Sequence, residues 1–438
     1  MLTLNERRIF LFLIVIIYTS YFLGFYLNEN SIGSGGPNGD LSWMWDNFEL
    51  FKNNSLIQAI NHKDFFGNRS PLLYIINIIF NPFINDVYFY RLSITLFSLI
   101  APIVFYSCLK KKYKNIDKEI LLLISSLILL SPFYRTTAFW GMEINYGIIT
   151  ALITLNYFIS ISQSNENYSL KNIFLLIFFS SLAVYFDQKL VIIPILVFIK
   201  IILKKKYLKI KITTAVIYFI FALPYLYLFY IWGGIVPTKT QIGNPNTITN
   251  IIRVNSLYFY HLGYASTIIA FYFFPFLFMR EKSFFVTIKE FFSKKINYLH
   301  LLIPLLYIFF IILNYSFKYY TVDNYWIGLG LVHKISLFLF SSITSQEIFT
   351  YVSFCFSWLI IVLFLDNRIY NMLILFFFFI IALLVWPLMQ EYFDPIIVIF
   401  ALLVFKTKLK FNYKNTLFLF FYLSTFLIAS NIYYSNII

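Results

Sequence analysis

Charge is scarce in this sequence. Only 12% of its 438 residues are charged, whereas 60% are hydrophobic. A soluble domain carries about twice that share of charged residues, and a soluble globule this apolar would expose adhesive patches over its surface. The composition therefore excludes a soluble enzyme and a nucleic-acid-binding domain, despite a net charge of +15. It also excludes a disordered chain, which requires low hydrophobicity, so the class that remains is an integral membrane protein.

Cysteine and the usual catalytic motifs are scarce too. The two cysteines, Cys108 and Cys355, lie far apart in apolar stretches, and the sequence contains no CxxC, HExxH, DxD, GxSxG or P-loop pattern. Redox chemistry and structural zinc are therefore not indicated. No metal site and no cofactor are predicted. The alternative is a divalent ion held by carboxylates that are scattered along the sequence.

Long hydrophobic runs predict an all-α integral membrane protein that forms a single polytopic domain over 1–438. A helix needs about 20 residues to cross roughly 30 Å of hydrocarbon. About thirteen transmembrane helices are expected, near 9–27, 88–109, 119–133, 140–162, 172–186, 190–203, 212–231, 257–279, 299–316, 350–365, 370–388, 394–406 and 415–435.

Lysine and arginine predict the orientation of these spans. Alternate loops hold most of the positive charge, in clusters that fall on the same side as the N-terminus, at 110–112, 204–206, 280–295 and 406–414. Basic loops stay in the cytoplasm, so the N-terminus is expected inside, the C-terminus outside, and the protein in the plasma (inner) membrane. The long outer segments are 28–87, 232–256 and 317–349, so any chemistry is expected on the outer face.

The first outer loop, 28–87, is the most informative segment. A glycine-rich turn at 33–39 leads to Asp40, which is placed to cap a helix over 41–53. In that helix apolar residues recur at helical spacing and polar residues lie opposite; the apolar residues are Leu41, Met44, Trp45, Phe48 and Phe51, and the polar ones are Asp46, Asn47, Glu49 and Lys52. This pattern predicts an amphipathic helix in the membrane interface. Asp40 is then either a helix cap or a functional carboxylate at the membrane surface.

A second short apolar segment follows Arg69. It begins at Ser70-Pro71 and ends at Asn81-Pro82, too short for a span. A cation beside a helix N-terminus suits a phosphate, and the alternative for Arg69 is contact with lipid headgroups.

Polar residues also mark the expected outer ends of later spans. Ionisable groups near membrane depth tend to face a cavity or a partner. The candidates are Arg135, Glu143, Asp187, Lys189, Trp232, His261, Glu391 and Tyr392. Asp187 and Lys189 also suit a simple turn, and a lone histidine such as His261 is also typical of a hydrogen-bonded core residue.

The arrangement resembles the GT-C superfamily of polytopic glycosyltransferases. The resemblance rests on an acid just after the first span, interfacial helices, a basic-Pro-Leu segment, and a second span that opens with Arg-Leu. These are Asp40, 41–53, Arg69-Ser70-Pro71-Leu72 and Tyr90-Arg91-Leu92-Ser93. Residues 232–239 and Gln390-Glu391-Tyr392-Phe393 are similar to segments of the dolichyl-phosphate-glucose glucosyltransferases, and lipid A and protein glycosyltransferases share the same fold.

The resemblance implies an inverting transfer of a sugar from a polyprenyl-phosphate donor to a glycan, lipid or protein acceptor. Asp40 would act as the general base, and Arg69, Arg135 and Lys189 would bind the donor phosphate. Glu143, Trp232, His261, Glu391 and Tyr392 would contact the acceptor or the sugar. The alternatives are an O-antigen-type polymerase or ligase, and a flippase or transporter of lipid-linked glycans, which would need broken helices and midplane charges.

Overall fold

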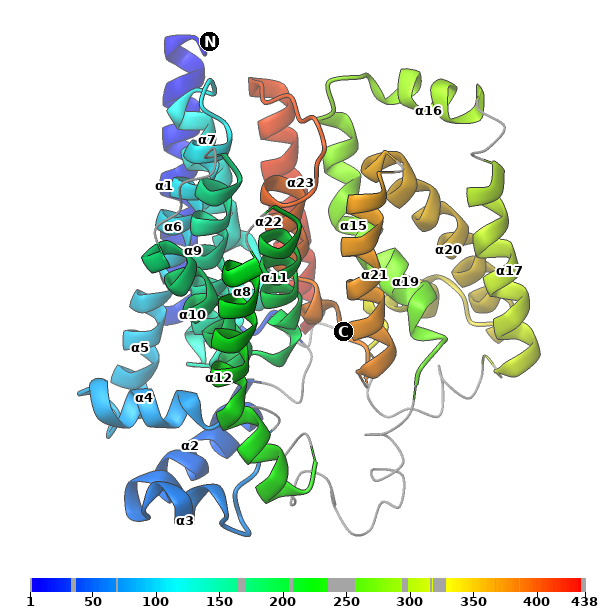
Figure 1. Cartoon of the computed structure of the whole chain (residues 1–438). Coiled ribbons are helices and arrows are strands. Elements are labelled where there is room, and N and C mark those ends of the chain that lie inside the picture. Colours follow the sequence, from blue (N-terminus) through cyan, green and yellow to red (C-terminus); the bar gives the residue numbers. More distant parts are fainter. Residues whose placement is uncertain are drawn as a thin grey trace. The chain divides into compact units, whose positions relative to one another are not determined.

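The computed structural model describes residues 2–32, 37–67, 70–163, 170–204, 208–234, 257–293, 298–315, 317, 328–366, 368–385 and 387–434. Within these ranges every regular element is a helix. The chain divides into two compact units (Figure 1). Unit 1 comprises Met1–Ile252 and Leu423–Ile438, and unit 2 comprises Arg253–Tyr422.

Seven helices in the described residues are long and apolar enough to cross a membrane. They are Leu4–Tyr26, Val87–Lys112, Ile144–Gln163, Leu208–Trp232, His261–Phe278, Ile343–Leu365 and Tyr413–Tyr434. An eighth is counted if Lys118–Leu130 and Pro132–Phe139 form one broken span, bent by 64°. These helices support a multi-pass membrane protein, but the expected thirteen spans are not confirmed.

Several expected spans are helices of fewer than 18 residues in the structure, too short to count among the seven. The run at 172–186 is α10 (Leu170–Phe186), 190–203 is the 3₁₀ turn η2 (Gln188–Val191) followed by α11 (Ile192–Lys204), and 394–406 contains α22 (Ile396–Leu403). An eight-residue helix covers only about 12 Å, which is well short of the hydrocarbon core. Hydrophobicity alone predicts these segments as membrane spans, because helices buried in a protein are as apolar as helices that cross a membrane.

The run at 119–133 is broken rather than continuous. It forms α7 (Lys118–Ser126), η1 (Leu127–Leu130) and then α8 (Pro132–Phe139). The Ser131 side chain caps α8 by accepting from the Tyr134 N–H, and Pro132 takes the first helical position. Proline cannot continue a helix that precedes it, so the chain turns at Ser131.

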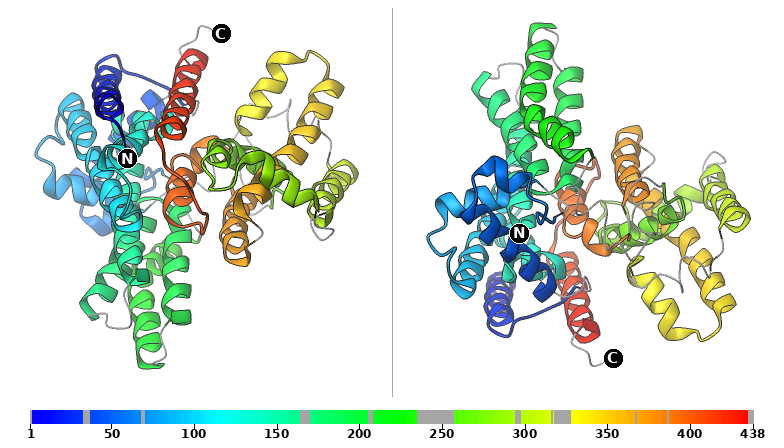
Figure 2. Two further views of the ribbon diagram at one scale, coloured as in Figure 1. Left: turned by 90° about the horizontal axis from the view of Figure 1, so that it is seen from above. Right: turned by 90° about the horizontal axis from the view of Figure 1, so that it is seen from below.

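Unit 1 is built around α9 (Ile144–Gln163), which contacts α6 (Ile100–Lys112) and α10. The helices α10, α11 and α12 (Leu208–Trp232) form a group that projects to one side of this unit (Figure 2). α1 (Leu4–Tyr26) and α5 (Val87–Ser98) both pack against α8.

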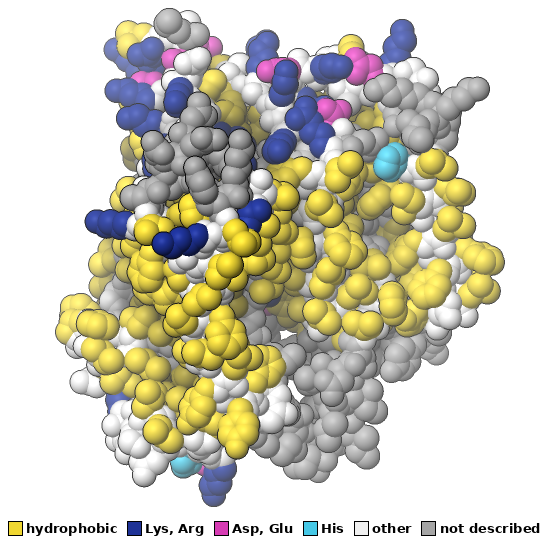
Figure 3. Space-filling view, in the orientation of Figure 1, with side chains coloured by type: hydrophobic (Ala, Val, Ile, Leu, Met, Phe, Trp, Pro, Cys, Tyr) yellow, Lys and Arg dark blue, Asp and Glu magenta, His cyan; other side chains and the backbone are white. Residues whose placement is uncertain are grey.

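The two ends of unit 1 differ in character. The end that holds the N-terminus carries many Lys and Arg side chains, whereas hydrophobic side chains cover the surface beyond it (Figure 3). There the Leu2 N–H donates to Asp117, and Lys111 donates to Ser160. At the opposite end lie α2 (Pro37–Asn53), α3 (Leu56–Ile60) and α4 (Leu72–Phe80) (Figure 1). The short helices expected in the first loop are therefore present.

Unit 2 contains α15 (His261–Phe278), which packs against α20 (Ile343–Leu365) and α19 (Gly330–Leu339). Its other elements are α16 (Phe284–Ser293), α17 (Tyr298–Asn314), α21 (Ile369–Leu384), η4 (Gln390–Tyr392), α22 and the first part of α23 (Tyr413–Tyr434). The segment 317–349, expected to be a loop, holds α19 and the start of α20. The loop expected at 232–256 lies outside the described residues beyond Gly234.

Candidate functional site

Asp40 lies in the first turn of α2 and is half-buried. The helix begins at Pro37, so Asp40 lies inside the helix, and the expectation that it caps a helix over 41–53 is wrong. Proline is favoured in the first turn because its missing N–H has no helical partner there. A carboxylate in that turn is favourably placed in the field of the helix. Asp40 shares a helix face with Met44 and Phe48, both of which are buried, so its face is directed toward the body of unit 1.

Aromatic contacts hold α2 in place. The Phe48 ring lies 5.1 Å from that of Tyr74 in α4 and 5.2 Å from that of Tyr90 in α5, and the Trp45 ring lies 5.7 Å from that of Tyr90. The Tyr90 hydroxyl donates to the carbonyl of Gly141 at 2.6 Å. Gly141 has φ of +74°. Through Tyr90, α2 is linked to the turn between α8 and α9.

Glu143 belongs to that turn and is half-buried. Its carbonyl accepts from the Gly147 N–H at 3.2 Å in the first turn of α9. A Cβ added at Gly147 would lie 3.4 Å from Cβ of Asp187. The start of α9 therefore packs directly on the turn between α10 and α11.

That second turn holds Asp187 and Lys189. Their side chains form an ion pair at 3.5 Å, and the Asp187 carboxylate also accepts from the Lys189 N–H at 3.2 Å. The Lys189 ammonium lies 5.3 Å from the centre of the Phe133 ring in α8. The interpretation of these residues as a turn is confirmed, and the turn keeps a positive charge beside α8.

Arg69 lies outside the described residues, but its neighbour Ser70 is fixed. The Ser70 hydroxyl donates to the carbonyl of Tyr185 at 2.5 Å, two residues before Asp187. The start of α4 and the end of α10 are thereby joined. The segments that carry Asp40, Glu143 and Lys189, and the residue that follows Arg69, are thus connected within unit 1 through contacts of Tyr90, Gly147 and Tyr185.

Arg135 is placed differently from the expectation for a phosphate ligand. Its side chain is 2% exposed, and its Nε and Nη2 donate to the Glu29 carboxylate at 3.0 and 2.6 Å. The remaining donors reach the hydroxyl and carbonyl of Ser20 at 3.1 and 2.7 Å and the carbonyl of Leu129 at 3.3 Å. All five N–H groups of the guanidinium are used, so in this structure Arg135 anchors the end of α1 to α8.

Glu29 is the residue that sequence reasoning missed. It follows the first span directly, and an acid at membrane depth is a signal for a buried partner. A second arginine binds the segment that contains Glu29. Arg91 donates to the side chain of Asn28 at 2.8 Å and to the carbonyl of Phe139 at 2.7 Å. Its guanidinium lies 3.9 Å from the centre of the Trp140 ring. Arg91, the arginine of the Tyr90-Arg91-Leu92-Ser93 motif, thus links the start of the first loop to the end of α8.

Trp232 is a packing residue of unit 1. It is 5% exposed, its ring lies 6.1 Å from that of Phe65, and its indole N–H donates to the carbonyl of Ile60 at 3.3 Å. The end of α12 is therefore pinned to α3. Contact of Trp232 with a sugar would require this packing to open.

The last three candidates belong to unit 2. His261 is 1% exposed and its Nδ1 lies 3.0 Å from the carbonyl of Ala382, as expected for a core histidine. Glu391 and Tyr392 are half-buried in η4. Burial lowers the pKa of Lys334 in the short helix α19 to about 8, and the charge of Glu391 opposes that shift.

In the part of the chain that the structure describes, three or more His, Cys, Asp or Glu side chains are nowhere grouped as a metal ion would require. Comparison of the chain with family models, with curated proteins and with solved structures gives no match.

Proposed function

We propose that this chain is a membrane glycosyltransferase that moves a sugar from a polyprenyl-phosphate donor to a glycan, lipid or protein acceptor. The observation that supports it is that the segments carrying Asp40, Glu143 and Lys189, and Ser70 beside Arg69, are connected within unit 1. These residues come from four separate segments of the chain. Two acids and a basic residue on connected segments supply the kinds of group that such a transfer needs.

In the proposed reaction the acceptor hydroxyl attacks the anomeric carbon of the donor sugar. The new bond joins the acceptor oxygen to that carbon, and the bond between the carbon and the phosphate oxygen breaks. Asp40 takes the acceptor proton as general base. The leaving polyprenyl phosphate keeps the electron pair, and attack from the opposite side inverts the anomeric centre.

The charge on the leaving phosphate requires cations that are already in place. Arg69 and Lys189 are assigned this role. Arg135 is assigned a positioning role, because Glu29 and backbone oxygens take up its donors. Glu143 would contact the acceptor or the sugar.

The proposal places the α2–α4 end of unit 1 at the outer face of the plasma (inner) membrane. The basic end that holds the N-terminus would face the cytoplasm, in accord with the positive-inside rule. The active-site groups would then lie where the polyprenyl chain can stay in the bilayer while the sugar is in water.

The test is sugar transfer by the purified full-length chain in lipid nanodiscs, with a panel of polyprenyl-phosphate sugars. Asp40→Asn is expected to lower kcat at least about 100-fold, the contribution typical of general-base catalysis. The matched control is Asp46→Asn, an exposed acid one and a half turns later in the same helix, which should keep full activity. Wild-type turnover by Asp40→Asn would remove Asp40 from the base role. Transport of a lipid-linked glycan without sugar transfer would overturn the proposal in favour of a flippase.

A further inference from the structure

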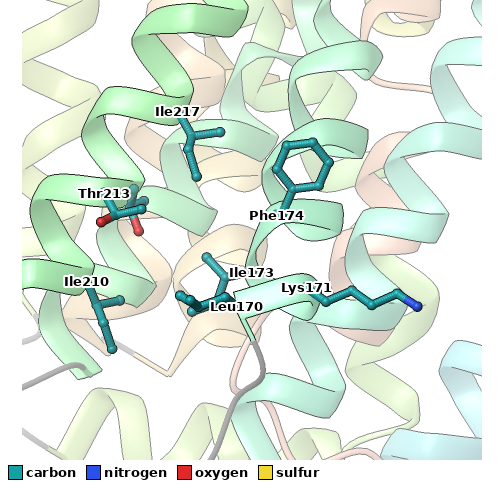
Figure 4. Close-up of a pocket in the computed structure, with 8 residues that line it drawn as sticks. Leu170, Lys171, Ile173, Phe174, Ile210, Thr213 and Ile217 are labelled. Atoms are coloured by element: carbon teal, nitrogen blue, oxygen red, sulfur yellow. The ribbon is translucent and has the colours of Figure 1, made fainter.

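A cavity of about 340 Å³ lies between α10 and α12 in unit 1 (Figure 4). Its wall is apolar and includes Ile173, Phe174, Ile210 and Ile217. It lies at the start of α10, about 24 Å along the helix axis from Asp187 at the other end. The cavity is therefore separate from the turn that holds Asp187 and Lys189.

Lysines lie where α10 and α12 begin, beside this cavity. Lys171 in the first turn of α10 is a lining residue, and its side chain extends away from Ile210, Thr213 and Ile217 (Figure 4). Lys209 and Lys211 flank the lining residue Ile210 in the first turn of α12. Cations at the start of two helices would attract an anionic headgroup if they lie at the membrane surface.

Two hydroxyl groups lie deeper than these lysines. Thr213 and Thr214 line the cavity two and three residues beyond Lys211, which is about 3–4.5 Å further along α12. Thr214 is 1% exposed, and within the described residues its hydroxyl has no hydrogen-bond partner. A buried hydroxyl without a partner is unfavourable, so an acceptor from a bound molecule would stabilise it.

We propose that this cavity binds an anionic glycerophospholipid from the bilayer. Along α12 the lysines on either side of Ile210 are followed by the lining hydroxyls of Thr213 and Thr214 and then by Ile217, the same order as phosphate, ester carbonyls and acyl chain in such a lipid. A volume near the lower end of ligand pockets, about 300–1,000 Å³, suits one acyl chain. A polyprenyl phosphate has no ester carbonyl between its phosphate and its chain, and would leave the Thr214 hydroxyl unpaired.

The test is native mass spectrometry of the delipidated full-length chain in detergent, titrated with phosphatidylglycerol, phosphatidylcholine or a polyprenyl phosphate. Phosphatidylglycerol is expected to bind most tightly. Combined Lys171→Ala and Lys211→Ala should weaken it about 25-fold, because each lysine near an anionic group contributes about a factor of five. Lys114→Ala, an exposed lysine of the loop between α6 and α7, is the control and should bind as the wild type.

The cavity itself is tested by filling it. Ile210→Phe should abolish binding, whereas Ile220→Phe, at a residue of α12 that is 53% exposed, should not. If Ile210→Phe does not fold, Thr214→Val serves instead; it should weaken binding about fivefold, through the loss of one hydrogen bond. Undiminished binding by the folded Ile210→Phe variant, equal affinity for phosphatidylcholine, or tighter binding of the polyprenyl phosphate would each overturn the proposal. None of these readouts depends on sugar transfer, so the glycosyltransferase proposal stands or falls separately.

Discussion

The two segments on either side of residues 33–36 in the first loop are held by different kinds of interaction. The segment before these residues, Asn28 to Ser31, is held by buried charge: Glu29 pairs with Arg135, and Asn28 accepts from Arg91. The segment after them, α2, is held by aromatic packing on Tyr74 and Tyr90. The first kind of contact depends on exact geometry and the second on apolar area.

This difference separates the residues that stabilise the fold from those proposed to take part in catalysis. The five donors of the buried Arg135 are all used, whereas Asp40 is half-buried and the Lys189 side chain is 14% exposed. The charges that hold the protein together and the charges proposed for catalysis are therefore different residues in neighbouring positions. Variants that act on one set and not on the other test this division.

The largest effect on stability is expected from Glu29→Gln. It leaves the Arg135 guanidinium buried without its counter-ion, which costs about 3–5 kcal/mol. The free energy of unfolding in detergent, measured by chemical denaturation, checks this value. The matched control is Glu49→Gln, which breaks the exposed pair between Glu49 and Lys52 and should cost at most about 0.5 kcal/mol. Equal losses in the two variants would show that buried charge does not anchor the segment Asn28 to Ser31.

Gly141→Ala is expected to have the second largest effect, because Gly141 contacts Tyr90, on which α2 packs. Its φ of +74° is unfavourable for any residue with a side chain, and the added Cβ would lie 2.4 Å from Cε1 of Tyr90. Tyr90 is fully buried and bonded to the same turn, so it cannot move aside. Backbone strain and overpacking together predict a loss of about 2–3 kcal/mol, measured in the same way.

Gly39→Ala is the matched control for this substitution. Gly39 lies in the first turn of α2, and an added Cβ would meet no atom within 4 Å there. Stability should change by less than about 0.5 kcal/mol, or rise slightly because alanine favours the helix. A loss in Gly39→Ala as large as that in Gly141→Ala would mean that the loss in Gly141→Ala does not come from its positive φ and its contact with Tyr90.

The local structure of the first loop could be predicted from sequence to a large extent. The apolar spacing at Leu41, Met44, Phe48 and Phe51 identified α2, and all four side chains are buried. This succeeds because helical periodicity is a local property. The length of a buried helix is not a local property. Helix α22 is as apolar as a membrane span but only eight residues long, and its neighbours in unit 2 cover it.

The site could be predicted only in part, because pairing between distant residues leaves no local pattern. Glu29 and Arg135 are 106 positions apart, and their ion pair exists only because α1 and α8 pack together. Asn47 is the clearest local error. It was placed on the polar face of α2 by its type, yet it is 3% exposed.

Asn47→Ala is expected to have the smallest effect of the three, and it acts on α2 alone. The Asn47 amide donates to the carbonyl of Phe66 and to the hydroxyl of Tyr74, and its oxygen accepts from the Phe66 N–H at 3.3 Å. Removal of these hydrogen bonds leaves backbone groups of Phe66 unpaired, which is expected to lower the free energy of unfolding by about 1–2 kcal/mol. Asn53→Ala, at an exposed position near the end of the same helix, should cost almost nothing. If Asn47→Ala is instead as harmful as Glu29→Gln, then polar bonds rather than aromatic packing hold α2, and the contrast between the two segments fails.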